Sequence, residues 1–508
     1  MSDGSQAARD GGTGAAPAGD RRQRPPASED APAADGGAVT GGASATGGTG
    51  RSAASAGADR RPRIAAAGAA AGLVAALALT LALTTPWRPL GGPVPGGAVA
   101  PNATRDFTTA QIDRAAAFDG AISVPAYLSL ALTLLAVLVL GLTPLGARLL
   151  GVVTRPARRW WPLQIIAAAV TLTAVLRIVT LPFRVWAETI SRRHGLSTQD
   201  WGGWTVDQLK GFMVGVVLWV VVLTLLHVLV RRFPRYWWAG AAAGAAALVV
   251  ALSFTYPLVV EPLFNSFRPM PAGPMRTELL RLAATDHVPV KDVLIADASR
   301  RTSALNAYVS GFGSTRRVVV YDTLLKSGRP DEIKLIVAHE LGHAKRGDVL
   351  YGTLMGALGV ASGVCVLYLL MTSRRLQERA GVAPSARPAA PAAGPPAPAL
   401  PAVADPRSLA LVLAMVTVLL QLGGPVQNLV SRRIEARADA HALDLTGDAA
   451  TFTRMQRALS VRNLSDLRPN PLEYALWSTH PSGPERIAMA RNWARLHGRP
   501  DPPPLTGR

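Results

Sequence analysis

Residues 331–348 read DEIKLIVAHELGHAKRGD, and the five residues HELGH occupy positions 339–343. In an α-helix, residues i and i+4 project from one face, so the imidazoles of His339 and His343 can both reach one zinc ion. Glu340 follows the first histidine directly, and its carboxylate can take a proton from an attacking water. The stretch therefore predicts one half of a zinc-hydrolase site on a helix.

The residues around this motif support a helix that lies outside a membrane. An apolar stripe recurs at helical spacing, and Asp331-Glu332 suit a helix start. Lys334 and Lys345-Arg346 flank the motif. Charges so close to the motif argue against an intramembrane-cleaving protease, whose motif lies within a span. The stripe consists of Ile333, Ile336, Val337, Leu341 and Ala344.

Long apolar runs dominate the rest of the chain. Hydrophobic residues make up 49% of the 508 residues and charged residues 17%. Runs of this length can cross a bilayer as helices. The sequence thus predicts an all-α multi-pass membrane protein, of about seven transmembrane helices, with a small α+β zinc-metallopeptidase domain. The predicted spans are Ile64–Thr85 (an anchor, too far from the N-terminus for a cleaved signal peptide), about Val124–Pro144, Trp161–Phe183, Gly211–Val230, Trp237–Val260, Val349–Met371 and Leu409–Val430.

The basic charge of the chain is concentrated beside these runs. The net charge is +20, and arginines accompany tryptophans at Arg155–Trp161 and Arg231–Trp238. Arginine with interfacial tryptophan is typical of a membrane border, so we expect a lipid bilayer as partner and no nucleic acid. Cys365 is the single cysteine, which excludes an intrachain disulfide and a thiolate zinc site.

The polar segments between the spans divide the predicted catalytic domain into two parts. In the first part, Met275–Thr285 has the pattern of an amphipathic helix, and three short strands are expected at Val293–Ala296, about Leu305–Val309 and Arg317–Tyr321. The second part is expected to be mostly helical. The predicted regions are 1–62 (disordered low-complexity tail), 63–260 (spans one to five), 261–348 (first catalytic part), 349–430 (spans six and seven with a Pro/Ala linker at 380–406) and 431–508 (second catalytic part).

A catalytic zinc needs three protein ligands, so the motif lacks one. Two spans separate His343 from residue 431, and two crossings return the chain to the same side of the membrane. Residues 431–444, SRRIEARADAHALD, can therefore supply the third ligand. Glu435, Asp439 and His441 are the candidates, and helical spacing alone does not choose between them. One carboxylate could bind the metal while the other accepts a hydrogen bond from a ligand histidine.

Other polar residues carry functional hypotheses. His480 and Arg486, in WSTHPSGPER at 477–486, could stabilise the oxyanion of a tetrahedral intermediate. His227 and Arg177 lie inside predicted spans, where an ionisable side chain is a functional candidate by default.

Taken together, these motifs resemble the type I CAAX prenyl endopeptidase family of integral-membrane zinc metalloproteases. The similarity runs from about Phe107 to Arg495. The residues that carry it are PLFNSF (262–267), SALNAY (303–308), YDTLL (321–325), the zinc helix, SRRIEARAD (431–439), THP (479–481) and Arg486.

The resemblance implies a role for each matching residue. It implies one zinc ion per chain on His339, His343 and Glu435, with Glu340 as base and proton shuttle. It implies that Asp439 orients a ligand histidine and that His480 and Arg486 contact the oxyanion or the substrate main chain. Asn306-Ala307-Tyr308 would form an edge strand that pairs with the substrate backbone. It also implies seven spans around a large chamber.

The expected partner is a peptide or protein substrate, and the sequence specifies no oligomeric state. The Gly/Ala/Arg-rich composition is typical of a high-GC bacterium, where CAAX processing is not expected. A quality-control protease that degrades misfolded proteins would use the same site, and a transporter or scaffold with a chance motif is the non-enzymatic alternative.

The two lines of evidence on membrane orientation disagree. The distribution of arginines places the N-terminus in the cytoplasm and the zinc site outside. The resemblance implies a cytoplasmic catalytic side, which is the orientation we expect.

Overall fold

The computed structural model describes residues 49–311, 313, 316–382 and 401–506. Within them, 7 helices are long and apolar enough to cross a membrane, and the chain is an integral membrane protein, as predicted. Each predicted span corresponds to one of these helices, although Ile64–Thr85 and Val124–Pro144 were predicted to end one and two residues too late. The helices are α1 (Thr49–Thr84), α3 (Thr109–Leu142), α5 (Trp161–Arg193), α6 (Trp201–Arg232), α7 (Trp237–Thr255, continued by the π-turn η2, Tyr256–Val260, and by α8, Glu261–Phe264), α12 (Asp348–Met371) and α14 (Leu409–Thr446).

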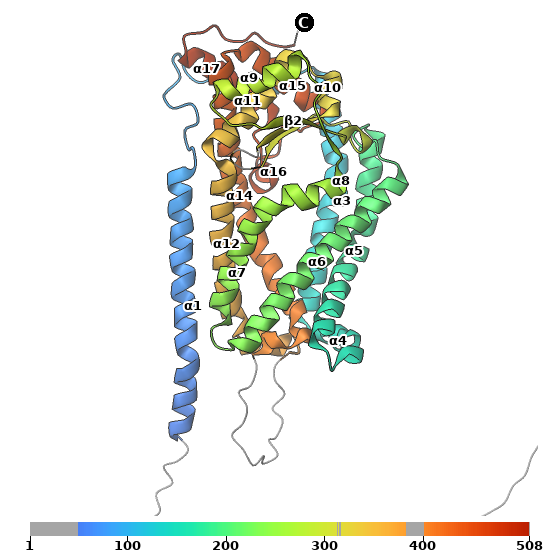
Figure 1. Cartoon of the computed structure of the whole chain (residues 1–508), viewed down its shortest axis with the longest axis vertical. Helices are drawn as coiled ribbons and strands as arrows, with labels where there is room; N and C mark the ends of the chain where they lie inside the picture. Colours follow the sequence, from blue (N-terminus) through green and yellow to red (C-terminus); the bar gives the residue numbers. More distant parts are fainter. Residues whose placement is uncertain (1–48, 312, 314–315, 383–400, 507–508) are drawn as a thin grey trace, which may run out of the picture. The chain divides into compact units, whose positions relative to one another are not determined.

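Six of these helices form a closed ring. In the order α3, α5, α6, α7, α12 and α14, each helix packs against the next, and α14 packs back against α3. Figure 1 shows this ring with the smaller elements of the catalytic region gathered at one end of it. Ala66 and Ala70 of α1 are buried against the ring, since small side chains allow helices to approach closely.

Several helices continue beyond the apolar run that predicted them. α14 has 38 residues, whereas a bilayer crossing needs about 20. No helix-breaking residue follows Val430, so the helix passes without interruption from the span into the segment that carries Glu435. The last span and the predicted third ligand therefore belong to one continuous helix, which includes Pro425 within the span.

A four-stranded sheet forms part of the catalytic region, in the order β1-β2-β4-β3. β2 (Asp292–Ala296) and β4 (Arg317–Tyr321) are parallel, while β1 (Phe267–Pro269) and β3 (Ala307–Ser310) pair antiparallel to their neighbours. The three predicted strands are present, and β3 is an edge strand. β1 was not predicted, because three residues that end in a proline carry no alternation of apolar and polar side chains.

Helices pack on this sheet and build a second apolar core. The stripe predicted on α11 is buried there, together with Val293 and Val318 of the sheet and Phe452 and Trp493 from the C-terminal helices. Burial of this stripe fixes how α11 rotates about its own axis, and so where its histidines point. The helices and turns of this region are α9 (Pro274–Thr285), η3 (Ala298–Arg300), α10 (Asp322–Ser327), α11 (Pro330–Arg346), α15 (Ala449–Arg462), α16 (Pro471–Trp477) and α17 (Gly483–Leu496).

Short elements connect the long helices. α1 begins at Thr49, upstream of the boundary at residue 62 expected for the tail, and it includes Pro62. The rest of the expected tail, residues 1–48, and residues 383–400 of the expected linker lie outside the described residues. The connecting elements are α2 (Ala103–Asp106), α4 (Pro144–Val153), η1 (Arg155–Ala157), α13 (Arg374–Arg379), η5 (Ala402–Ala404) and η6 (Pro406–Ser408).

Candidate metal centre

The motif helix α11 begins and ends on local signals. Pro330 occupies its first turn, and the side chain of Glu332 accepts a hydrogen bond from the backbone N–H of Arg329. Gly347 ends the helix at φ 69°, in the left-handed region that favours glycine. The chain then turns directly into α12, whose first residue is Asp348.

A second glycine sets the distance between α11 and α14. A Cβ atom built on Gly342 would lie 3.0 Å from Cδ2 and 3.1 Å from Cβ of His441. These distances are tighter than ordinary packing, so any side chain at position 342 would require His441 to shift by a few tenths of an ångström. The close approach brings the His339 side chain against the Glu435 side chain.

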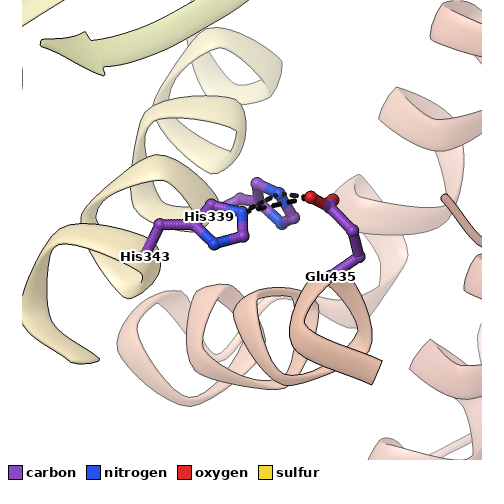
Figure 2. A group of neighbouring side chains, drawn as sticks. All are labelled: His339, His343 and Glu435. Carbon is purple, nitrogen blue, oxygen red and sulfur yellow. Dashed lines mark hydrogen bonds and ion pairs between the residues drawn. The ribbon is translucent and has the colours of Figure 1, made fainter. Parts of the chain in front are cut away.

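Three candidate ligands meet between the two helices. Nε2 of His339 lies 3.3 Å from Oε2 of Glu435, and Nε2 of His343 lies 3.5 Å from Oε1 of the same carboxylate. The two Nε2 atoms are 3.1 Å apart. Figure 2 shows both imidazoles directed at the carboxylate from the opposite helix.

These residues fit a tetrahedral metal ion. Ligand atoms about 2.1 Å from a tetrahedral ion are about 3.4 Å from one another, close to the separations found here. Oε2 of Glu435 is buried and, apart from its ion-pair contact with His339, has no polar partner among the described residues, as suits an atom that binds a cation. Two histidines and one glutamate are also a ligand set that catalytic zinc uses. The chain thus presents a His-His-Glu site that could hold a metal ion.

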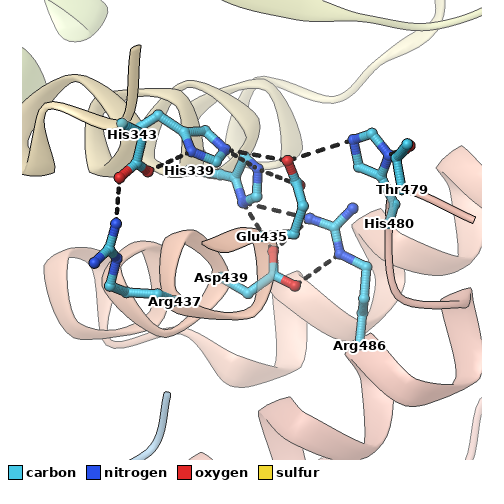
Figure 3. A network of polar contacts seen from close by, with 9 residues as sticks. His339, His343, Glu435, Arg437, Asp439, Thr479, His480 and Arg486 are labelled. Atoms are coloured by element: carbon cyan, nitrogen blue, oxygen red, sulfur yellow. Dashed lines mark hydrogen bonds and ion pairs between the residues drawn. The ribbon is translucent and has the colours of Figure 1, made fainter. Parts of the chain in front are cut away.

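Asp439 fixes the orientation of the first histidine. Its Oδ1 lies 2.8 Å from Nδ1 of His339, and its Oδ2 accepts a hydrogen bond of 2.7 Å from Nε of Arg486. Figure 3 shows this chain of contacts leading from Arg486 to the imidazole. Burial lowers the pKa of His339, but its contacts with Asp439 and Glu435 outweigh burial and raise the pKa to about 10. These contacts favour the doubly protonated imidazolium form of His339 in the metal-free protein.

Asp348 does the same for the second histidine. Its Oδ2 lies 2.8 Å from Nδ1 of His343, and Arg437 of α14 donates to its other oxygen. Sequence reasoning missed both residues. The available signal was a carboxylate placed just beyond the glycine that ends the motif helix.

The third ligand candidates occupy different places. Asp439 contacts Nδ1 of His339, the ring nitrogen that does not face Glu435. Nε2 of His441 lies 2.8 Å from Oδ2 of Asp286, and Lys345 pairs with the other oxygen of that carboxylate at 2.7 Å. Glu435 is thus the one of the three that faces both Nε2 atoms.

The site opens into a large cavity. The cavity has a volume of about 1390 Å³ and is lined by Glu340, His480, Arg486 and the edge strand, among others. Burial raises the pKa of the Glu340 carboxyl, and the nearby histidines only partly oppose this. A carboxylate with a raised pKa is better matched to proton transfer near neutrality.

His480 lies at the rim of the metal site. Its Nε2 is 3.4 Å from Oε1 of Glu435, and its Nδ1 is 2.8 Å from the hydroxyl oxygen of Thr479. If the Thr479 hydroxyl donates to Nδ1, Nε2 carries the proton and points toward the metal site. The His480 side chain is 60% exposed, so it remains accessible to a substrate.

The segment 306–308 lies along the cavity. Its outer edge has no partner strand among the described residues, because β3 pairs only with β4. Just before β3, the side-chain amide of Asn463 accepts from the N–H of Leu305 at 2.9 Å and donates to its carbonyl at 3.2 Å. The free edge therefore starts at Asn306.

The chain is similar to two family models that follow one another along it. The model of peptidase family M48 matches residues 269–494, and the model described as CAAX prenyl protease N-terminal, five membrane helices, matches residues 119–266. The first match includes every residue of the candidate metal site. The second covers α5, α6, α7 and much of α3.

Individual proteins give the same result. An uncharacterized metalloprotease of Bacillus subtilis, YhfN, is 28% identical over 328 residues, which span 65% of this chain and 73% of the relative. A protein named CAAX prenyl protease 1 homolog from Oryza sativa is 29% identical over 321 residues, spanning 61% and 69%. The crystal structure of Ste24p from S. mikatae has the same fold, with a TM-score of 0.63 at 20% identity over 83% of this chain and 97% of that one. By its sequence and its fold, the chain is a membrane metalloprotease and belongs to peptidase family M48, as the resemblance of its motifs indicated.

Proposed function

We propose that the protein is a zinc-dependent endopeptidase whose metal ligands are His339, His343 and Glu435. The observation that carries the proposal is the convergence of these three side chains on one point, with their ligand atoms all within 4.8 Å of one another. When bound, zinc supplies Lewis-acid polarisation and makes water more acidic. The protein residues supply proton transfer, orientation and substrate binding.

Glu340 is the proposed general base. It lies next to His339 on α11 and lines the cavity, and burial raises its pKa. Its carboxylate takes the proton of the attacking water and returns it to the amine that leaves when the peptide bond breaks. Glu340 alone thus moves the proton from the attacking water to the leaving amine.

His480 and Arg486 are proposed to face the developing oxyanion or the substrate main chain. His480 is exposed to the cavity, which suits a donor that acts on a substrate oxygen. Arg486 donates twice to Asp439, so it also holds the carboxylate that orients His339. We therefore assign Arg486 a positioning role in addition to any substrate contact.

The substrate is proposed to be a peptide segment bound in extended form. Among the described residues, the outer edge of β3 and of Asn306 just before it has no partner strand, and this edge lines the cavity beside the metal site, so Asn306-Ala307-Tyr308 can pair with a substrate backbone. The cavity, at about 1390 Å³, is larger than the roughly 300–1,000 Å³ typical of small-molecule sites. Its size favours a polypeptide over a small molecule.

We further propose that the catalytic end of the ring faces the cytoplasm. The similarity to the CAAX prenyl protease homologs supports this orientation, whereas the distribution of arginines favours the reverse. The seven spans place the N-terminus and the catalytic end on opposite sides in either case.

The central test separates metal binding from catalysis. We expect Glu340→Gln to retain near-stoichiometric zinc and to lower peptidase kcat by about 10²–10⁴-fold, the range for loss of a general base. We expect His339→Ala to lose both zinc and activity. Metal analysis and hydrolysis of quenched fluorescent peptides give the two readouts, with Glu378→Gln on the exposed helix α13 as control. Undiminished hydrolysis by Glu340→Gln would refute the assigned base, and wild-type activity without zinc would refute the metal.

A further inference from the structure

Two arginines of α5 project into the helix ring, and no proposed catalytic step uses them. Arg177 and Arg184 are seven residues apart, so they lie on one face of the helix. Both line a second cavity of about 240 Å³, whose walls come from α3, α5, α6 and α14. Because α6 and α14 are not neighbours in the ring, a cavity that touches both lies inside it.

The two guanidinium groups converge on one uncharged atom. Nη1 of Arg184 donates to Oε1 of Gln208 at 3.2 Å, and Nη1 of Arg177 donates to the same oxygen at 3.4 Å. Arg177 is half-buried and Arg184 is exposed, and two like charges that share one neutral acceptor repel each other. An anion placed between them would remove that cost.

Neither α5 nor α6 provides that anion. Glu188 is the one acidic residue of α5, and it pairs with Arg192 at 2.8 Å and accepts from Ser197 at 2.6 Å. Asp207 is the one acidic residue of α6, and it accepts from Gln199 at 2.7 Å. In the part of the chain that the structure describes, neither Arg177 nor Arg184 forms an ion pair, so two positive charges are left uncompensated.

The lining of the cavity indicates the chemistry of the missing group. Guanidinium forks match the planar geometry of a carboxylate and can bind it through paired hydrogen bonds. Most other lining residues are apolar, including Leu176, Trp219 and Leu223. A carboxylate attached to an apolar group therefore suits this cavity.

The position of the cavity indicates where the ligand comes from. On α3, Leu130 lines the catalytic cavity and Thr133 lines the second one. These residues are less than one helical turn apart, so the second cavity lies directly beyond the first along α3. A peptide bound at the metal site can reach it from within the ring, whereas a bilayer lipid would have to pass between packed helices.

We propose that Arg177 and Arg184 form a subsite for a carboxylate carried by an apolar part of the peptide substrate, with Gln208 holding both guanidinium groups in place. This inference rests on the proposed endopeptidase function. The carboxylate has two possible sources, the C-terminus of the substrate or an acidic side chain within it.

The test compares peptides that differ in one charge. Quenched fluorescent peptides cleaved by the wild-type enzyme are each made in three forms, ending in leucine with a free carboxylate, in leucine amide, or in glutamic acid amide. We expect kcat/KM to be about tenfold higher or more for a carboxylate form than for leucine amide, as for a charged hydrogen-bonded contact. If the peptide that ends in leucine with a free carboxylate is preferred, the subsite binds the C-terminus of the substrate. If the peptide that ends in glutamic acid amide is preferred, it binds an acidic side chain. In Arg177→Gln/Arg184→Gln, the favoured form should fall to the leucine amide rate, which itself stays unchanged.

Matched variants make the outcome specific. Arg177→Lys/Arg184→Lys should keep part of the preference, and the exposed pair Arg374→Gln/Arg375→Gln should leave every rate unchanged. Equal wild-type cleavage of all three forms would overturn the subsite, as would an equal loss on all forms in the double glutamine variant. Phosphatidylglycerol nanodiscs could instead stabilise the protein against heat in a way that depends on the two arginines, while the three peptides are cleaved equally. That result would assign the arginines to a lipid and would also overturn the subsite. In each of these cases, cleavage of the leucine amide form by wild type but not by Glu340→Gln would still uphold the peptidase.

Discussion

Each candidate ligand histidine uses its two ring nitrogens differently. The Nδ1 atoms of His339 and His343 contact Asp439 and Asp348, and the Nε2 atoms both face Glu435. A carboxylate at Nδ1 fixes the tautomer, holds the ring in position and makes Nε2 a stronger ligand. The two histidines are therefore oriented before any metal binds.

Removing the second of these carboxylates tests its role. His343 and Arg437 contact different oxygens of Asp348, and in Asp348→Asn one of these becomes an NH2 group that cannot accept, so one of the two contacts is lost. We expect zinc affinity to fall by about 10–100-fold, as for other partners of metal-bound histidines. Competition with a chelator of known affinity measures the change, with Glu378→Gln as control. Unchanged affinity would show that His343 is held in position by other contacts.

Proton release on metal binding tests the charge of His339. Its pKa of about 10 means that the metal-free site holds a proton below that pH, and zinc must displace it. We expect binding of each zinc ion to release about one proton at pH 8. Because of His339 alone, the apparent zinc affinity should rise about tenfold per pH unit as the pH approaches 10. Calorimetry in two buffers of different ionisation enthalpy counts the protons. Heats that do not depend on the buffer would contradict a protonated His339.

At the scale of elements, the site is an interface between α11 and α14. Local signals set where α11 begins and ends, and its apolar stripe sets its rotation. The distance between the helices depends on Gly342, where a Cβ atom would lie only 3.0 Å from Cδ2 of His441. A glycine that permits close approach has no distinctive sequence pattern, so this constraint could not be predicted.

Gly342→Ala tests that constraint. The added methyl group must displace the His441 side chain or separate the helices, which we expect to destabilise the fold by about 1–3 kcal/mol. Zinc affinity should fall with it, because Glu435 moves away from the histidines. Thermal unfolding in detergent and chelator competition measure both effects. Gly352→Ala on α12 is the control, since its Cβ would meet nothing within 4 Å. Similar behaviour of the two variants would show that α11 and α14 need no close contact.

At the scale of the whole molecule, the ring of six helices encloses the space behind the metal site. Its closure depends on α14, which packs on both α12 and α3 and also carries Glu435. The same helix thus completes the membrane domain and the candidate metal site. Any movement of α14 in the membrane would be transmitted to the ligand without an intervening loop.

The orientation of this assembly is open to a direct measurement. With a cytoplasmic catalytic end, a reporter fused after Arg508 should be active only if it works in the cytoplasm. A second fusion, upstream of Arg60, should report the opposite compartment, because seven spans separate the two ends. Activity of a periplasm-only reporter at the C-terminal fusion would reverse the orientation and support the arginine distribution instead.

The sequence by itself determined the number of spans, the motif helix and the side of the membrane from which a third ligand could come. These features follow from the length of apolar runs, from helical periodicity and from counting crossings, all of which are local properties of the chain. Tertiary structure decided the rest. Glu435 and His441 lie on one helix but about 120° apart around its axis, so only the packing of α14 on α11 determines which of them faces the histidines. The roles of Asp348, Arg437 and the two uncompensated arginines of α5 were likewise set by contacts between segments far apart in the sequence, which no local pattern records.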